Sequence, residues 1–71
     1  MFNERALKHI MLDANCTNKA LADACGISPS ALYRRLSGAV PFNVGEIDRC
    51  TEFLRLTPEK RNEIFFAENV S

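Results

Sequence analysis

Residues 17–38 read T-N-K-A-L-A-D-A-C-G-I-S-P-S-A-L-Y-R-R-L-S-G, a stretch that predicts two short helices joined by a tight turn. Thr17 can cap the first helix, and the alanine-rich run after it has a high helix propensity. Gly26 ends this helix, because glycine accepts the left-handed conformation that closes a helix C-terminus. Ser28 and Pro29 then form a start signal, with serine as the cap and proline at the first helical position. The pattern therefore predicts a helix–turn–helix unit over about residues 17–37.

The apolar side chains of this stretch recur at the spacing of one helix face, which predicts that the two helices pack together. Ala22 lies four residues before Gly26, where a close crossing of two helices needs a small side chain. Five further apolar positions would hold the second helix against the first: Leu21, Cys25, Ile27, Leu32 and Leu36. Tyr33 and Arg34 are then expected on the side that faces away from this contact.

Three more helices are predicted outside this stretch, each from a capping residue followed by apolar side chains at helical spacing. Asn3 begins the first of these helices, which is expected to end near Asn15 and Cys16. Asn43 and Glu46 resemble a capping box and begin the second. Thr57 and Pro58 begin the third. The apolar positions are Ala6, Leu7, Ile10, Met11 and Ala14, then Ile47, Cys50, Phe53 and Leu54, then Ile64, Phe65 and Phe66. Residues 39–42 are expected to form a loop. With no alternating segment to predict a sheet, we expect an all-α, compact bundle of five short helices.

The length and composition exclude several classes of protein. A chain of 71 residues is enough for one domain, so we expect a single unit over residues 1–71. No apolar run is long enough to span a membrane, and the N-terminus lacks a secretory signal, so a cytoplasmic protein is expected. One histidine, no glycine-rich phosphate loop and no spaced carboxylate pair predict neither an enzyme nor a cofactor or small-molecule ligand.

The cysteines predict no metal site and no disulfide framework. Cys16, Cys25 and Cys50 are odd in number, and neither a C-x-x-C pair nor a partner spacing for His9 is present. Cys25 and Cys50 fall where a small apolar side chain would pack, so we expect them to be ordinary core thiols. His9 lies on the polar side of the first helix and is expected at the surface.

The chain has no net charge, with nine basic and nine acidic residues, which argues mildly against nucleic-acid binding by charge alone. The distribution is uneven, however. Between residues 17 and 42 there are three cations, Lys19, Arg34 and Arg35, and one anion, Asp23. A modest basic face on a neutral body is therefore expected.

Residues 17–38 resemble the helix-turn-helix of the Cro and C1 repressors, the XRE family. The alanine, glycine and following aliphatic residue of that family match Ala22, Gly26 and Ile27. The five-helix layout, with the motif as helices two and three, extends the resemblance over most of the chain. Its small size is more like a short phage or prophage repressor than a two-domain one. The resemblance implies a transcriptional regulator that binds double-stranded DNA in a sequence-specific way.

The resemblance also implies which side chains contact bases and which contact phosphates. Base edges in the major groove would be contacted by Ser28, Pro29, Ser30, Tyr33 and Arg34. Phosphates would be contacted by Thr17, Asn18, Lys19, Arg35, Ser37 and Asn43. Arg34 is the strongest candidate for specificity, because a guanidinium can bond O6 and N7 of guanine together.

The chain departs from the family pattern at three places. Asn18 stands where glutamine is common, and Pro29 replaces a long polar residue, so it can at most touch a thymine methyl. Arg35 occupies a position that is often aliphatic, while Leu36 supplies the apolar side chain. Outside this motif, arginines such as Arg34 and Arg35 are more often solvated surface charges, Tyr33 could pack its ring on a helix, and Asn43 is first of all a cap.

One such motif contacts few base pairs, so we expect a homodimer on a palindromic operator, with two reading helices about 34 Å apart. The fourth or fifth helix would form the interface, with one of Phe53, Phe65 and Phe66 on it.

The main alternative to a DNA-binding regulator is a protein-interaction module, an antirepressor or antitoxin-like protein that keeps the fold but binds another regulator. The zero net charge and Pro29 in the reading helix favour that alternative slightly.

Overall fold

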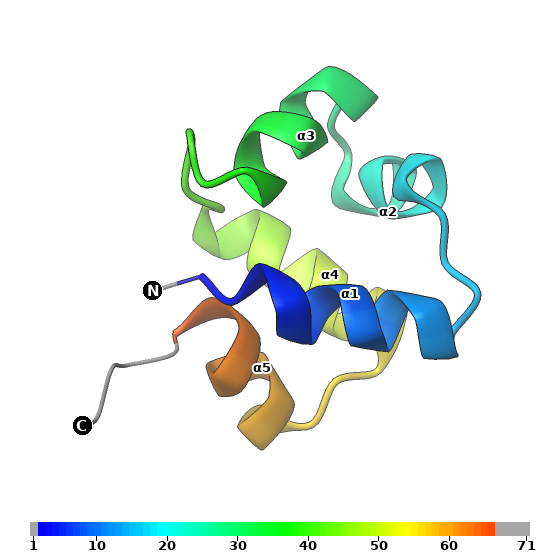
Figure 1. Cartoon of the computed structure of the whole chain (residues 1–71), viewed down its shortest axis with the longest axis vertical. Coiled ribbons are helices and arrows are strands. Elements are labelled where there is room, and N and C mark those ends of the chain that lie inside the picture. The colour runs from blue at the N-terminus through cyan, green and yellow to red at the C-terminus, as the bar shows by residue number, and fades with distance from the viewer. Residues whose placement is uncertain (1, 67–71) are drawn as a thin grey trace.

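The computed structural model describes residues 2–66, so residues 1 and 67–71 of the expected domain lie outside the described part. Five helices follow one another with no strand in this part: α1 (Glu4–Asp13), α2 (Asn18–Cys25), α3 (Pro29–Leu36), α4 (Val44–Leu54) and α5 (Pro58–Phe65). In Figure 1, α1 crosses in front of α4, with α5 on one side and the pair α2 and α3 on the other. The prediction of an all-α bundle of five short helices is confirmed.

Each helix begins at a residue whose side chain accepts a hydrogen bond from the backbone N–H three positions later. These caps are Asn3, Thr17, Ser28, Asn43 and Thr57. Proline occupies the first turn of α3 and of α5, where its missing N–H costs nothing. The capping box of Asn43 and Glu46 is present. The first helix is shorter than expected, since it ends at Asp13 and the chain turns through Asn15 in the left-handed region.

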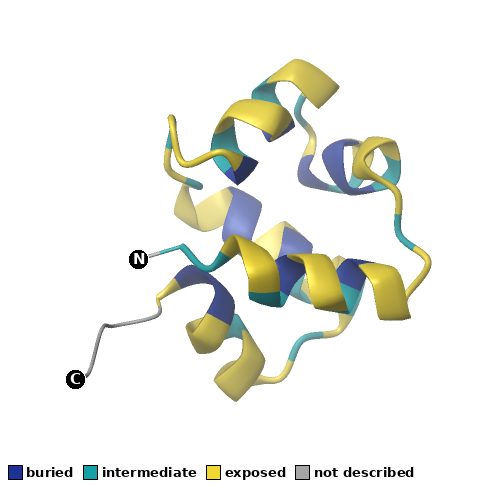
Figure 2. Cartoon of the chain, in the orientation of Figure 1, coloured by how far each residue is buried: buried dark blue, intermediate teal, exposed yellow. Residues whose placement is uncertain are grey.

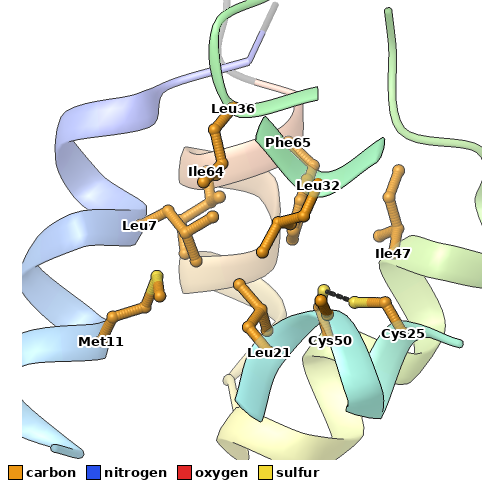
Figure 3. Packing of buried hydrophobic residues seen from close by; sticks show 11 residues of the cluster. Leu7, Met11, Leu21, Cys25, Leu32, Leu36, Ile47, Cys50, Ile64 and Phe65 are labelled. Carbon is orange, nitrogen blue, oxygen red and sulfur yellow. Dashed lines mark hydrogen bonds between the residues drawn. The ribbon is translucent and has the colours of Figure 1, made fainter. Parts of the chain in front are cut away.

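The core lies where all five helices meet, and Figure 3 shows its side chains converging from each of them. Helix α2 packs chiefly on α4 and α3, while α1 packs on α5. The buried apolar residues are Leu7, Met11, Leu21, Ala22, Cys25, Leu32, Leu36, Ile47, Cys50, Ile64 and Phe65. Figure 2 shows the buried faces turned inward and the outer faces of the helices exposed. This core confirms the helix periodicity on which the fold was predicted.

The aromatic residues are arranged differently from the expectation. Phe65 is buried, but its ring partners are Phe2 and Phe42, at centroid distances of 6.0 and 5.2 Å. These two come from the N-terminal segment and from the loop before α4, outside any helix. Phe53 and Phe66 remain 48% and 44% exposed. The aromatic cluster thus joins the start of the chain to the end of α5, a contact that helix periodicity could not predict.

Candidate nucleic-acid interface

The turn between α2 and α3 depends on Gly26, which adopts φ +73° at the end of α2. The backbone N–H of Ile27 donates to the carbonyl of Ala22 at 3.0 Å, which closes the helix. Ala22 is fully buried, as expected where two helices cross closely. This local geometry ends α2 and lets the chain turn directly into α3.

Helix α3 has one buried and one exposed face. Leu32 and Leu36 lie in the core, while Tyr33 is 71% exposed. Ser30, Tyr33, Arg34 and Ser37 follow at spacings of three and four, so they share one solvent-facing side of the helix. Ser28 and Pro29, at its N-terminus, are exposed as well. The structure thus places Ser30, Tyr33, Arg34 and Ser37 on one side of α3, with Ser28 and Pro29 exposed at its N-terminal end, and we call these six residues the α3 face.

Arg34 is the charged group of the α3 face. Within residues 2–66 its side chain makes no ion pair, and its guanidinium is exposed. Tyr33 beside it presents a ring and a hydroxyl to solvent rather than packing into the core. A guanidinium and a phenol on one exposed helix face can donate to acceptors in a groove of matching shape.

The two serines near the ends of α3 also have structural roles. Ser28 Oγ accepts from the Ala31 N–H at 3.1 Å, and Ser37 Oγ donates to the Arg34 carbonyl at 3.0 Å. A hydroxyl that accepts one bond can still donate through its own hydrogen, so the cap leaves Ser28 able to bond an outside acceptor. Ser37 retains its acceptor lone pairs.

The start of α2 lies beside the α3 face. An open hollow is lined by Asn18, Tyr33 and Ser37 together with Lys8 of α1, and also by Glu4, Met11 and Leu36. Thr17, Asn18 and Lys19 are all exposed, with Thr17 Oγ1 capping the Ala20 N–H at 3.1 Å. Lys19 lies 3.6 Å from Asp23 in an ion pair that is open to water. Sequence reasoning did not find Lys8, because nothing in the pattern of α1 indicates that its polar side borders the motif.

The charges at the helix N-termini distinguish the motif from its surroundings. Within residues 2–66, α1, α4 and α5 each carry a glutamate in the first turn, whereas α2 and α3 carry no acidic residue there. The N-terminal end of a helix attracts anions through its free N–H groups and its dipole. The first turns of α2 and α3 therefore have no carboxylate of their own helix beside their free N–H groups.

Arg35 and Asn43 lie at the edge of this region and are engaged within the protein. Arg35, with a side chain only 17% exposed, donates from Nε to Glu46 Oε1 at 2.7 Å and from a terminal nitrogen to the Ala31 carbonyl at 3.2 Å. Asn43 Oδ1 accepts from the Glu46 N–H at 2.8 Å, although the residue as a whole is exposed. The side chain of Arg35 is thus largely buried, whereas the other predicted phosphate contacts are exposed. Its contact with DNA stays a prediction.

Glu46 is the site residue whose tertiary role the sequence did not reveal. It is 3% exposed, and one oxygen, Oε1, accepts from both Arg35 and the Asn43 N–H. Burial alone would raise the pKa of this carboxyl, but the bonds from Arg35 and Asn43, with the charges of Arg35 and Arg49, lower it below its usual range. The capping pattern indicated only the bond to Asn43, because a partner eleven residues away leaves no local signal.

Two further findings concern residues 2–66 as a whole. No cluster of three or more metal-ligating side chains occurs among residues 2–66. In the same part of the chain, no helix is long and apolar enough to cross a bilayer. The surface consists instead of exposed hydroxyls, an aromatic ring and cations around two helix N-termini.

Comparison with known proteins places the chain in a helix-turn-helix family. A family model described as a helix-turn-helix domain covers residues 5–64, which include nearly all of α1 through α5. No curated protein and no solved structure matches the chain. The matched region contains the whole α3 face and the start of α2.

Proposed function

This chain belongs to the helix-turn-helix domain family, and from that premise we propose that it is a sequence-specific, double-stranded-DNA-binding regulator of transcription. Helix α3 would enter the major groove, as in the Cro and C1 repressors that residues 17–38 resemble. The observation that carries the proposal is the α3 face, where Ser30, Tyr33 and Arg34 share one exposed side and Arg34 has no ion-pair partner among residues 2–66. A short phage or prophage repressor is the type we favour.

Base contacts in this proposal come from the α3 face. Arg34 supplies the specific contact, with its guanidinium on the O6 and N7 of one guanine, worth about 1–3 kcal/mol of discrimination. Ser28, Ser30 and Tyr33 add weaker contacts, and Pro29 packs on a thymine methyl. The small side chains at the start of α3 support this arrangement, because they allow close approach of the helix to the base edges.

Phosphate contacts come from the start of α2. Thr17, Asn18 and Lys19 surround a helix N-terminus whose first turn lacks an acidic residue. A DNA phosphate placed there gains charge-assisted bonds from N–H groups and from Lys19. Ser37 and Asn43, which follow the last residue of α3, supply further phosphate contacts in this proposal. Arg35 serves this set indirectly, by holding α3 against α4 through Glu46.

A homodimer would double the contacts and match a palindromic operator. Phe53 of α4 is the favoured interface residue. It is 48% exposed and lines a surface hollow with Ala24, Arg49 and Glu52. An arginine and a glutamate beside one exposed ring suit a two-fold contact, in which each residue can meet its opposite charge on the other copy. Phe66 is less free for such a role, since Arg61 lies 5.1 Å from its ring centroid.

The proposal is tested by selecting bound duplexes from a random pool, with the wild-type chain and with Arg34→Ala. We expect a consensus from the wild type and a loss of preference at one base position, normally guanine, from the variant. Arg55→Ala is the matched control, because Arg55 is an exposed arginine that follows α4, outside the motif. An unchanged consensus with Arg34→Ala would remove Arg34 from the groove.

A salt titration separates DNA binding from the alternative of a protein-interaction module. Phosphate contacts release counterions, so the logarithm of the affinity should fall linearly as the logarithm of salt rises. Failure to bind any duplex at low salt would favour the alternative.

Sedimentation of the wild type and of Phe53→Ser tests the dimer. We expect a dimer that the substitution weakens. A strict monomer, both free and on DNA, would contradict the proposed dimer.

A further inference from the structure

The core contains a pair of thiols that the proposed function does not use. Cys25 of α2 and Cys50 of α4 are both 0% exposed, and their sulfur atoms lie 2.6 Å apart (Figure 3). They come from two helices that pack extensively on each other. The third cysteine, Cys16, lies between α1 and α2, is half-buried, and donates from its thiol to the Thr17 carbonyl. The fold thus selects one pair out of three cysteines.

We propose that Cys25 and Cys50 are an oxidation site, at which a peroxide converts the two thiols into a reversible disulfide that joins α2 to α4. Formation of this bond needs sulfur atoms that already approach each other, with α-carbons a few ångströms apart. Two helices in direct contact, with their cysteine side chains pointing at each other, meet the requirement on the sulfur atoms. The proposal concerns the folded chain alone and does not depend on DNA binding.

The reaction balances with one peroxide for each pair. The Cys25 sulfur attacks one peroxide oxygen, the O–O bond breaks, and hydroxide leaves and takes up the thiol proton as water; Cys25 becomes a sulfenic acid. The Cys50 sulfur then attacks the Cys25 sulfur, the S–O bond breaks, and a second water leaves with the Cys50 proton. Two thiols are oxidised by two electrons, and hydrogen peroxide is reduced to two waters.

The surroundings make Cys25 the attacking sulfur. The hydrogen bond with Cys50 lowers the pKa of Cys25, against the opposing effects of burial and of Glu46, and the charges of Arg49 and Arg35 lower it further. Arg49 also donates to the Cys25 carbonyl at 3.2 Å, which keeps a cation next to this residue. The pKa of Cys50 is raised, first by the bond to Cys25 and then by burial. Since the thiolate is the nucleophile and the Arg49 cation lies beside Cys25, we assign the first attack to Cys25.

The disulfide would enclose all of α3. The linked segment runs from residue 25 to residue 50, and α3 and the loop that follows it lie inside it. Closing a loop of this length removes conformational freedom from the unfolded chain and thereby stabilises the fold. Because both sulfur atoms are fully buried, α2 and α4 must open locally to admit peroxide; after they close again, the disulfide joins the two helices where they already pack. Oxidation would thus tie α4 to α2, the helix on which α3 packs, and we call this effect the clamp.

Tryptic mapping of the full chain tests the site directly. The three cysteines fall on separate peptides: 9–19 carries Cys16, 20–34 carries Cys25 and 50–55 carries Cys50. The folded protein is treated with hydrogen peroxide, then alkylated in denaturant and digested. In the wild type and in the control Cys16→Ser, we expect peptides 20–34 and 50–55 to be joined, with the loss of two hydrogens. Alkylated thiols on both peptides, a bond to peptide 9–19, or a bond between two chains would overturn the proposal.

Thermal unfolding gives a second readout. Peroxide should raise the Tm of the wild type and of Cys16→Ser by on the order of 10 °C, and dithiothreitol should reverse the rise. Cys25→Ala and Cys50→Ala, after circular dichroism shows that they are helical, should show no rise. A Tm that does not change or that falls in the joined wild type would contradict the clamp. Neither readout involves DNA, so these results stand apart from those on the proposed function.

Discussion

Arg35 and Glu46 form the ion pair that connects α3 to α4, with 2.7 Å between Arg35 Nε and Glu46 Oε1. The same carboxylate oxygen accepts from the Asn43 N–H and so completes the cap of α4. One buried side chain therefore sets the start of α4 and secures the C-terminal half of α3. This ion pair also explains how Arg35 can occupy a position where the resembled family often has an aliphatic residue, because Glu46 neutralises its charge.

Replacing the carboxylate should weaken the fold. Glu46→Gln leaves the Arg35 charge, which is 17% exposed, without its partner, and we expect the free energy of unfolding to fall by about 2–4 kcal/mol in urea titrations. Asp48→Asn is the matched control, because the pair of Arg61 and Asp48 is much more open to water. It should cost less than about 1 kcal/mol. Equal losses in the two variants would show that burial adds nothing to the pair of Arg35 and Glu46.

The same carboxylate should make the stability depend on acid. Because the pKa of Glu46 is lower in the folded chain than in the unfolded one, its charged form stabilises the fold above the unfolded pKa of about 4.3. This contribution is lost as the pH falls through the folded pKa. We expect the wild type to lose more stability than Glu46→Gln between about pH 5 and pH 2 in urea titrations. Parallel pH profiles for the two proteins would contradict the lowered pKa.

Ser28 has a structural role that can be separated from its role on DNA. Ser28→Ala removes the cap of α3 and should lower the free energy of unfolding by about 1 kcal/mol. Ser30→Ala, on the same exposed surface but without a capping role, should change it by less than about 0.5 kcal/mol. Ser28→Asp keeps a capping oxygen and adds a negative charge, so it should preserve stability while weakening DNA binding. Retained DNA affinity in Ser28→Asp would place the start of α3 away from the DNA.

Lys19 is expected to act through charge alone. Lys19→Gln should weaken binding to all duplexes alike and reduce the slope of affinity against salt by about 0.9, the value for one lost phosphate contact. Lys60→Gln is the matched control, since Lys60 forms a similar exposed ion pair with Glu63 on α5. It should leave the slope unchanged. If the two variants behave alike in filter-binding assays at several salt concentrations, the start of α2 makes no phosphate contact.

The sequence alone determined the helices and the motif, because their causes are local. A capping side chain acts on the N–H three residues later, Gly26 supplies the left-handed turn, and apolar spacing selects the buried faces of α2 and α3. For the same reason it indicated which side of α3 is exposed, since Tyr33 and Arg34 fall outside the face that Leu32 and Leu36 bury. These features need only neighbours within about one or two turns of helix.

The tertiary structure alone decided the contacts that join distant segments. The bond between Arg35 and Glu46, the touching thiols of Cys25 and Cys50, and the aromatic cluster of Phe2, Phe42 and Phe65 each link different parts of the chain. Which of several arginines, cysteines or phenylalanines meet depends on how the helices cross, and a crossing angle is set by the packing of the whole core rather than by any local pattern. The position of Lys8 beside the α3 face was decided in the same way.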